Sequence, residues 1–509
     1  MNPDFEWPVS LAIQGVRSKR TPTQQISAIE RCIERLLEKM RLSKEPFAIG
    51  YVDGMISCIS SMDSSFDVVS QVIQFCREKI KKRLSAEKTT KLNLKKIDFE
   101  VLARFFYSLR VVSNEELLVV NLFLEEMCTE WRDENPYLYK NKLSDNLDNN
   151  LELMTIEKQN YDSMVISACL GLHGLQNMHA NSSGVQLAVD AIARQLKLCL
   201  RQHASFAYIH LSMAMVGLRC MSSEHQECLD AVGILVDLAE RSFETNVDPM
   251  VGEEISLMLA GLCHKNNDNI NGSVARMLKF TAARMVESFD MGVTLAPFEV
   301  ALAFGGMQSL HADSPDVRTI IGLLSDSLVN SQMEGQWLNA TAIVVVLNAL
   351  QRMDHCSIEL QKLLRILANQ IKKMPEDISN DGAATALHGL QMMDSSCDSV
   401  NELLDALSQK IFTSNEELSS IDAGRCLNGF RSMTKMSHPL SVILMKIAEK
   451  MKDSNVAPMQ PSSMMLCIQG IAHFNPDEYE EAKAICAGIR SRMFLGPNEP
   501  FPSHSNNEK

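Results

Sequence analysis

A ladder of amide and arginine side chains recurs along the 509-residue sequence at nearly even spacing. The ladder belongs to a repeated motif, clearest in residues 386–393 and 426–433, whose Gln or Arg we number position 0. Positions −3, 0 and +1, which we call the ridge, hold no Asp or Glu in any of eleven copies. Amides and guanidiniums can bond base edges and phosphates, and amides can equally bond the backbone of an extended peptide. The candidate ligand-binding residues of the ridge are Gln176, Arg219, Gln308, Gln351, Arg352, Gln391, Asn428 and Arg431.

The ridge also has a purely structural interpretation. Its amides could join adjacent repeats by hydrogen bonds, and packing alone could then exclude acids from these positions. The sequence leaves both interpretations open.

A second candidate site is a basic stretch near the N-terminus. It could contact nucleic acid or an acidic partner, or it could be a solvated helix end where cations are favoured. Its residues are Arg77, Lys79, Lys81, Lys82, Arg83, Lys88, Lys91, Lys95 and Lys96.

The spacing of the motif predicts the elements that position the ridge. Most copies lie 40–45 residues apart, which is typical of stacked helical repeats. Each copy contains the motif, a short polar turn and an amphipathic segment such as residues 400–411, so each predicts two helices. A helix pair cannot bury both of its faces alone, and stacking completes the core. We therefore expect an all-α fold, an α-solenoid of about eleven helix-turn-helix repeats. Position 0 falls at residues 17, 60, 110, 176, 219, 263, 308, 351, 391, 431 and 472.

The motif predicts how its helix packs, if positions −8 to +2 form one continuous helix. Positions −8, −4 and −1 are mostly apolar and define a core face. Position −2 is small in every copy and is Gly in eight, which predicts close approach of a neighbouring helix. Position +2 is Met in six copies and is expected to fill the core.

Composition narrows the class of protein. Hydrophobic residues make up 46% and charged residues 22%, as in a folded globular chain. The net charge of −14 is unusual for a nucleic-acid-binding protein, but residues 1–150 are neutral, with 22 basic and 22 acidic residues. The longest apolar segment, residues 340–350, is too short to span a membrane. The 14 cysteines contain no C-x-x-C pair, which argues against zinc fingers and favours reduced thiols inside a cell.

These patterns divide the chain into four parts. We expect neutral N-terminal repeats at 5–130, a polar insertion at 131–159, acidic C-terminal repeats at 160–494 and a disordered tail at 495–509. The first residues, Met1–Trp7, carry two acids and no apolar stretch, so the sequence shows no clear transit peptide.

The motif Leu-His/Asn-Gly-Leu-Gln-x-Met resembles the octotricopeptide and heptatricopeptide helical repeats. The resemblance rests on residues 174–178, 389–393 and 429–433. It implies a non-catalytic RNA-binding protein of a mitochondrion or another organelle. His or Asn stands where that family has an aromatic residue, and no RAP-type domain follows Arg492. HEAT and armadillo repeats have a similar length and would imply protein partners.

The sequence predicts a binding protein rather than an enzyme. It contains no phosphate-binding loop, no H-E-x-x-H and no G-x-S-x-G motif, and we expect no cofactor and no metal. We expect the ridge to hold single-stranded RNA, within an RNA-processing or organellar gene-expression assembly. The alternative is a scaffold that binds extended protein segments as a subunit of a larger complex. We expect an intracellular protein without membrane association, cytoplasmic if it is not organellar.

Overall fold

The computed structural model describes residues 161–179, 181–244, 248–267, 272–353, 355–413, 417–452 and 459–492, with isolated residues between 71 and 132. Throughout these residues the fold is all-α, as predicted, and one isolated β-bridge joins Ile378 to Ile411. The basic stretch has all nine residues outside the described part, and so does the tail 495–509; of the insertion 131–159 only Trp131 and Arg132 are described.

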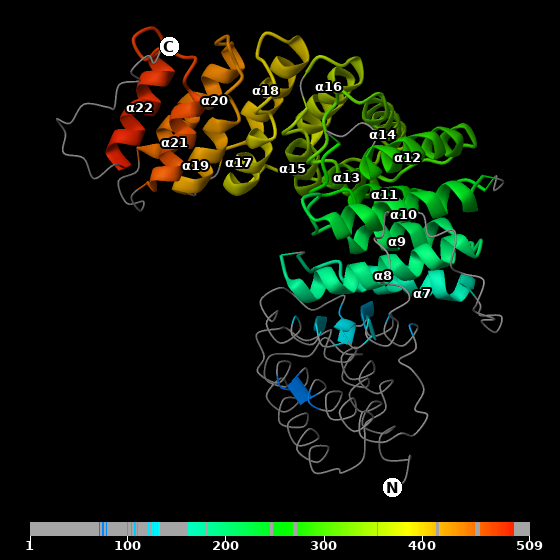
Figure 1. Ribbon diagram of the computed structural model, residues 1–509. Helices are drawn as coiled ribbons and strands as arrows, with labels where there is room; N and C mark the ends of the chain where they lie inside the picture. The colour runs from blue at the N-terminus through cyan, green and yellow to red at the C-terminus, as the bar shows by residue number, and fades with distance from the viewer. Residues whose placement is uncertain are drawn as a thin grey trace, which may run out of the picture. The chain divides into compact units, whose positions relative to one another are not determined.

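The described helices form eight pairs, each with a short first helix and a longer second helix (Figure 1). The first helices are α7 (Tyr161–Gly174), α9 (Tyr208–Gly217), α11 (Gly252–Ala260), α13 (Pro297–Gly306), α15 (Ala340–Ala349), α17 (Asn380–His388), α19 (Ser420–Asn428) and α21 (Pro461–Gly470). The second helices are α8 (Ser183–Arg201), α10 (Gln226–Ser242), α12 (Ser273–Asp290), α14 (Pro315–Met333), α16 (Ile358–Lys373), α18 (Asp398–Lys410), α20 (His438–Met451) and α22 (Glu480–Arg492).

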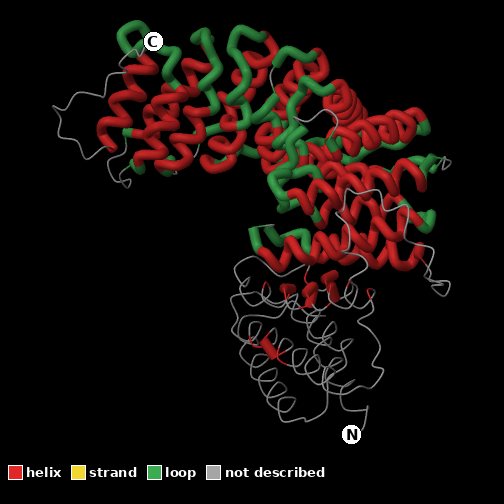
Figure 2. The backbone as a smooth tube through the Cα atoms, in the orientation of Figure 1, coloured by secondary structure: helices red, strands yellow, loops and turns green. Residues whose placement is uncertain are grey.

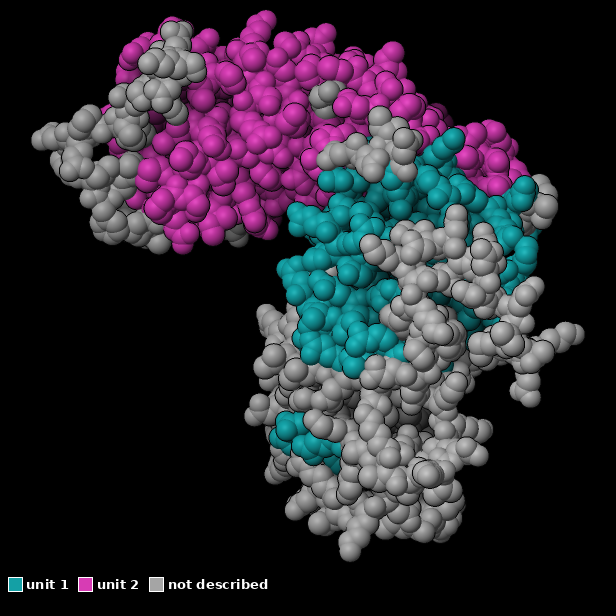
Figure 3. Space-filling view, in the orientation of Figure 1, with its two compact units in different colours: residues 1–248, 257–281 teal, residues 249–256, 282–509 magenta. Residues whose placement is uncertain are grey.

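Contacts divide the chain into two compact units (Figure 3). Unit 1 contains residues 1–248 and 257–281, and unit 2 contains residues 249–256 and 282–509. In both units first helices pack on first helices and second helices on second helices, as in α7 with α9 and α16 with α18. Figure 2 shows the same alternation of helices and short connections along the chain. This stacking of helix pairs is an α-solenoid, which confirms the predicted fold class.

The residue patterns of the motif explain the packing. The predicted core positions are buried, for example Ala383, Leu387 and Leu390 of one repeat. The methionine at position +2 is at most 1% exposed in Met178, Met221, Met353, Met393 and Met433, which confirms its place in the core.

The second helices also follow the sequence. Leu403, Leu404 and Leu407 of α18 are fully buried on one face. Helix α14 begins at Pro315, which suits the first turn because proline lacks an N–H that this turn would leave unpaired. Ser314 precedes it but makes no side-chain capping bond.

One expectation about the motif is wrong. The first helix does not continue through positions 0 to +2, because it ends at position −3 or −2 in every described repeat. The chain then tightens into a turn, in which Leu390 N–H donates to Leu387 and Gln391 N–H donates to His388. Positions 0 and +1 therefore lie in this turn rather than on a helix face.

Candidate nucleic-acid interface

The glycine at position −2 sets the distance between neighbouring first helices. A Cβ added to Gly389 would stand 1.9 Å from the carbonyl oxygen of Leu347, and one added to Gly429 would stand 2.1 Å from that of Leu387. Real Cβ atoms do not approach an oxygen so closely, so the predicted role of this glycine is confirmed. In both cases the carbonyl belongs to position −4 of the preceding repeat. The same pairing recurs for Gly174, Gly217, Gly261 and Gly470.

This close approach brings each turn against the preceding turn, so ridge side chains bridge repeats. Gln391 Nε2 donates to the carbonyl of Gln351 at 3.0 Å, and Gln351 Nε2 donates to that of Gln308 at 3.5 Å. Arg219 donates to the carbonyl of Gln176 at 3.2 Å. In all three the side chain at position 0 meets the carbonyl at position 0 of the preceding repeat.

Position +1 behaves in the same way. Arg352 donates to the carbonyl of Ser309 at 3.2 Å, again one repeat back. Arg219 also donates to the side chain of Asn177 at 2.8 Å. These ridge side chains therefore join adjacent repeats by hydrogen bonds, as the structural interpretation of the ridge expects. That they also contact a ligand stays a prediction.

A buried lysine extends this bonding in unit 1. Lys265 is fully buried and its Nζ donates to the carbonyls of Leu218, Met221 and Cys263, at 2.6, 3.1 and 3.2 Å. Burial lowers the pKa of Lys265, because it removes the water that would stabilise the charged ammonium. Its three bonds join two successive repeats, as the ridge does elsewhere.

The ridge differs in accessibility along the chain. Gln176, Arg219, Gln308, Gln351 and Arg352 are half-buried. Gln391 and Asn428 are buried, and Arg431 is exposed. Gln391, Asn428 and Arg431 lie together at one junction of unit 2. Gln176 and Arg219 meet at a junction of unit 1, and Gln351 and Arg352 bond the turn that contains Gln308.

That junction is a small polar cluster between α17 and α19. Asn428 Nδ2 lies 3.2 Å from Gln391 Oε1 and 3.4 Å from His388 Nδ1. Burial lowers the pKa of His388, and the positive charges of Arg425 and Arg431 lower it further. The imidazole is therefore neutral at neutral pH and can both donate and accept hydrogen bonds.

The carboxylate of Asp394 lies at the edge of the same junction and links it to the next repeat. Asp394 accepts hydrogen bonds from the backbone N–H and the hydroxyl of Thr434 in the next repeat. Burial alone would raise the pKa of Asp394, but bonds from Thr434 and Ser396 outweigh it and lower this pKa. Asp394 thus stays ionised and bonded within the protein.

In the last four repeats positions −10 and −6 of the first helix are exposed or half-buried, and position −3 is exposed at Gln469, half-buried at Asn348 and His388 and buried at Asn428. In the last four repeats position −3 is Asn348, His388, Asn428 or Gln469, an amide or imidazole each time. The side chains of Asn348 and Gln469 bond no residue in the described part of the chain. They are available to a ligand.

Arg425, at position −6, is a residue that the sequence analysis missed. It is the one Lys or Arg within the eight described first helices. Its spacing in the sequence could have identified it, because residues 425, 428 and 431 follow one another at intervals of three. These three residues surround the polar cluster.

The described residues contain no group of three His, Cys, Asp or Glu side chains placed to hold a metal ion. Their cysteines are free, and burial raises the pKa of Cys199 to about 12, which keeps that thiol protonated. Of the described helices, not one combines the length and apolar character needed to cross a bilayer.

Comparison with known proteins gives a distant likeness. No family profile matches the sequence, and no curated protein matches it. The chain is similar to two crystal structures of the pentatricopeptide repeat protein PPR10 in complex with an 18-nt psaJ RNA element, one with three cysteine-to-serine substitutions. In both, identity is 12%, the match covers 98% of this chain and 69% of that chain, and the TM-score is 0.30.

Proposed function

We propose that this protein is a non-catalytic helical-repeat protein that binds single-stranded RNA across the first-helix face formed by positions −10, −6 and −3 of its C-terminal repeats. The observation that carries the proposal is the recurrence of an amide or imidazole at position −3 in four consecutive repeats. Such side chains both donate and accept hydrogen bonds, so they suit the edges of unpaired bases. Helical repeats can read one base per repeat with two or three side chains.

Neighbouring positions supply further polar groups. Thr341 lies at position −10, and Thr385 and Arg425 lie at position −6. Asp381 is the one acid among positions −10, −6 and −3 of these four repeats. A face with hydroxyls, amides and few acids is compatible with a polyanion despite the net charge of −14.

A protein partner is a second candidate, favoured by an apolar patch on α13 and α15. Phe298 is 69% exposed, and Leu302 and Val345 are 38% and 37% exposed. Val345 lies against Gly305, so the patch continues from one first helix to the next. Contiguous exposed apolar patches mark sites of interaction with other proteins. Membership of the octotricopeptide or heptatricopeptide class, an organellar location and a place in a larger assembly remain predictions.

The proposal is tested by the anisotropy of a fluorescein-labelled, random-sequence single-stranded RNA pool titrated with the full chain. We expect binding that weakens as salt rises, since phosphate contacts release counterions. The variant Asn348→Ala/Gln469→Ala should bind less tightly, by about 1–3 kcal/mol for each base that its side chains no longer bond. These side chains bond nothing in the described structure, so the variant should fold normally.

Phe298→Ser is the matched control, because it changes the apolar patch instead. It should leave RNA affinity unchanged and weaken capture of a protein partner. An absence of RNA binding at low salt would refute the proposal. If the Asn348→Ala/Gln469→Ala variant binds RNA with unchanged affinity, the first-helix face is not the RNA-binding surface.

A further inference from the structure

Two arginines beside the polar cluster of unit 2 have no acidic partner among the described residues. Arg425 and Arg431 are both exposed. The side chain of Arg425 makes no hydrogen bond or ion pair with a described residue, and that of Arg431 bonds only the thioether of Met392 there, at 3.4 Å. In contrast, Arg276 and Arg365 pair with acids of the preceding or following second helix. The two charges beside the cluster are therefore left unneutralised within the described part of the chain.

Both guanidiniums act on one imidazole. The charges of Arg425 and Arg431 contribute to the lowered pKa of His388, after the larger effect of burial. Asp422, the acid of α19, lies in the first turn of the helix and is bonded by Ser419. The junction thus has a neutral centre, two cations without acidic partners at its rim, and the carboxylate of Asp394 at its edge, which is bonded by Thr434.

The centre of the cluster has an unused acceptor. Asn428 is 3% exposed, and its Nδ2 is bonded while its Oδ1 has no hydrogen-bond partner among the described residues. Buried polar atoms are nearly always paired, and an unpaired one costs free energy. A donor on a bound ligand, such as a ribose hydroxyl or a base N–H, would satisfy this oxygen once the side chains that cover it move aside.

We infer that His388, Asn428, Arg425 and Arg431 form a nucleotide-binding site in which the two guanidiniums hold one backbone phosphate and Asn428 bonds the adjoining nucleoside. The planar guanidinium matches phosphate oxygens with two parallel hydrogen bonds, which an amide at the same place cannot do. This inference rests on the proposed function, since it assigns a phosphate contact to the same RNA-binding face.

The test compares Arg425→Gln/Arg431→Gln with Arg365→Gln/Lys483→Gln in the full chain. The control removes two positive charges from the second helices, where both side chains contact acids. With the same random-sequence RNA pool, the first variant should lower the slope of log K against log salt by about 0.7, the value for one phosphate contact in a single strand. The control should leave the slope unchanged.

Asn428→Leu separates the two parts of the site. It should weaken RNA binding without changing the salt slope, because its contact is uncharged. Circular dichroism of each variant verifies that the helices persist, and a variant that loses its helical signal is replaced by Arg425→Gln alone, which breaks no contact within the described structure.

The outcomes distinguish this site from the broader proposal. If the unmodified protein binds RNA but neither arginine variant changes the slope, the site is refuted and the proposed function stands. An equal slope change in the control would also refute the site. If the unmodified protein does not bind RNA but binds a phosphorylated peptide through these arginines, both the ligand class and the proposed function are wrong.

Discussion

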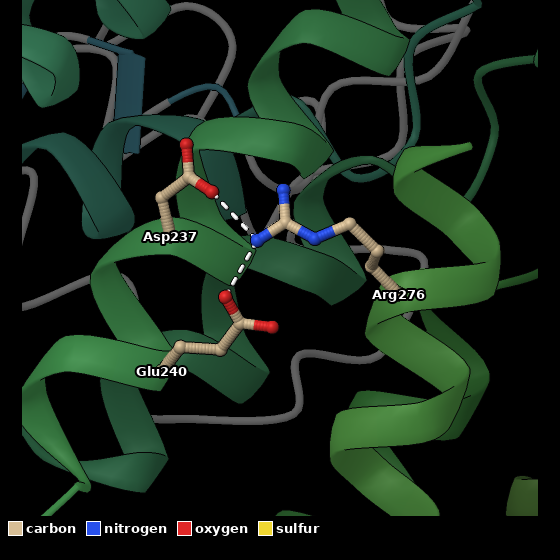
Figure 4. A network of polar contacts seen from close by, with 3 residues as sticks. All are labelled: Asp237, Glu240 and Arg276. Atoms are coloured by element: carbon tan, nitrogen blue, oxygen red, sulfur yellow. Dashed lines mark hydrogen bonds and ion pairs between the residues drawn. The ribbon is translucent and has the colours of Figure 1, made fainter. Parts of the chain in front are cut away.

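The first and second helices of the repeats are joined to their neighbours by different chemistry. First helices approach so closely that glycine faces a backbone carbonyl, and amide and arginine side chains of the turns that follow bond backbone carbonyls of the preceding repeat. Second helices are joined by ion pairs, as where Arg276 of α12 reaches Asp237 and Glu240 of α10, at 2.7 and 2.5 Å (Figure 4). Further ion pairs join α16 to α14 and to α18.

This difference explains where the acidic charge lies. Within the described first helices acids occur in the first turn, as in Asp162, Glu299 and Asp422. Acids near a helix N-terminus are favoured by the helix dipole. The second helices carry acids along their length, so an average charge of the chain says little about its first-helix face.

The largest effect should come from filling the close approach of two first helices. Gly429→Ala would place a Cβ 2.1 Å from the carbonyl oxygen of Leu387, so the helices must separate. We expect the free energy of unfolding to fall by about 1–3 kcal/mol or more, measured from the midpoint of urea unfolding. Gly322→Ala in α14 is the control, because its nearest neighbour is a flexible Glu359 carbon at 3.6 Å. Helix propensity should make that variant up to about 1 kcal/mol more stable, and destabilisation of both variants alike would contradict the comparison.

A smaller effect should follow from removing one buried amide of the ridge. Gln391→Ala removes the bond to the carbonyl of Gln351 and leaves Asn428 with fewer partners. We expect a loss of about 1–3 kcal/mol in the free energy of unfolding, since buried groups would be left unpaired. Gln469→Ala, at an exposed ridge position, should leave the urea midpoint unchanged. Equal midpoints for the two variants would mean that the ridge bonds contribute nothing to stacking.

The smallest effect should come from the second helices. Arg276→Gln removes two ion pairs whose side chains are 40–52% exposed. Because water and salt screen such pairs, we expect a loss of about 1 kcal/mol or less, which added salt should abolish. Thermal unfolding at low and high salt measures this. A loss that persists at high salt would indicate a role for Arg276 in packing instead of charge pairing.

Much of the fold could be predicted from the sequence because helical repeats leave local signals. The spacing of Leu387, Gly389 and Met393 and of their counterparts identified the core face, the close approach and the core methionine. These depend on positions within one repeat, which the motif itself contains.

The site could be predicted only in part, because it depends on how one repeat fits the next. The motif gave no sign that the first helix ends near Gly389, which moves Gln391 from a helix face into a turn. Nor did it indicate that Gln391 would meet Gln351, since that bond spans 40 residues. Arg425 was missed because it lies at position −6, outside the ridge positions −3, 0 and +1.

The pairing of position −2 with position −4 of the preceding repeat has an evolutionary consequence. Each such junction uses the same two positions, so a duplicated repeat meets its parent copy with a surface that already fits. Gene duplication could therefore lengthen the array by whole units without redesigning any contact. A deletion that is not a whole repeat would place a side chain where Gly429 or Gly470 now admits a carbonyl. Selection for a small residue at position −2 would preserve the stacking of the repeats while the residues of their exposed faces diverged.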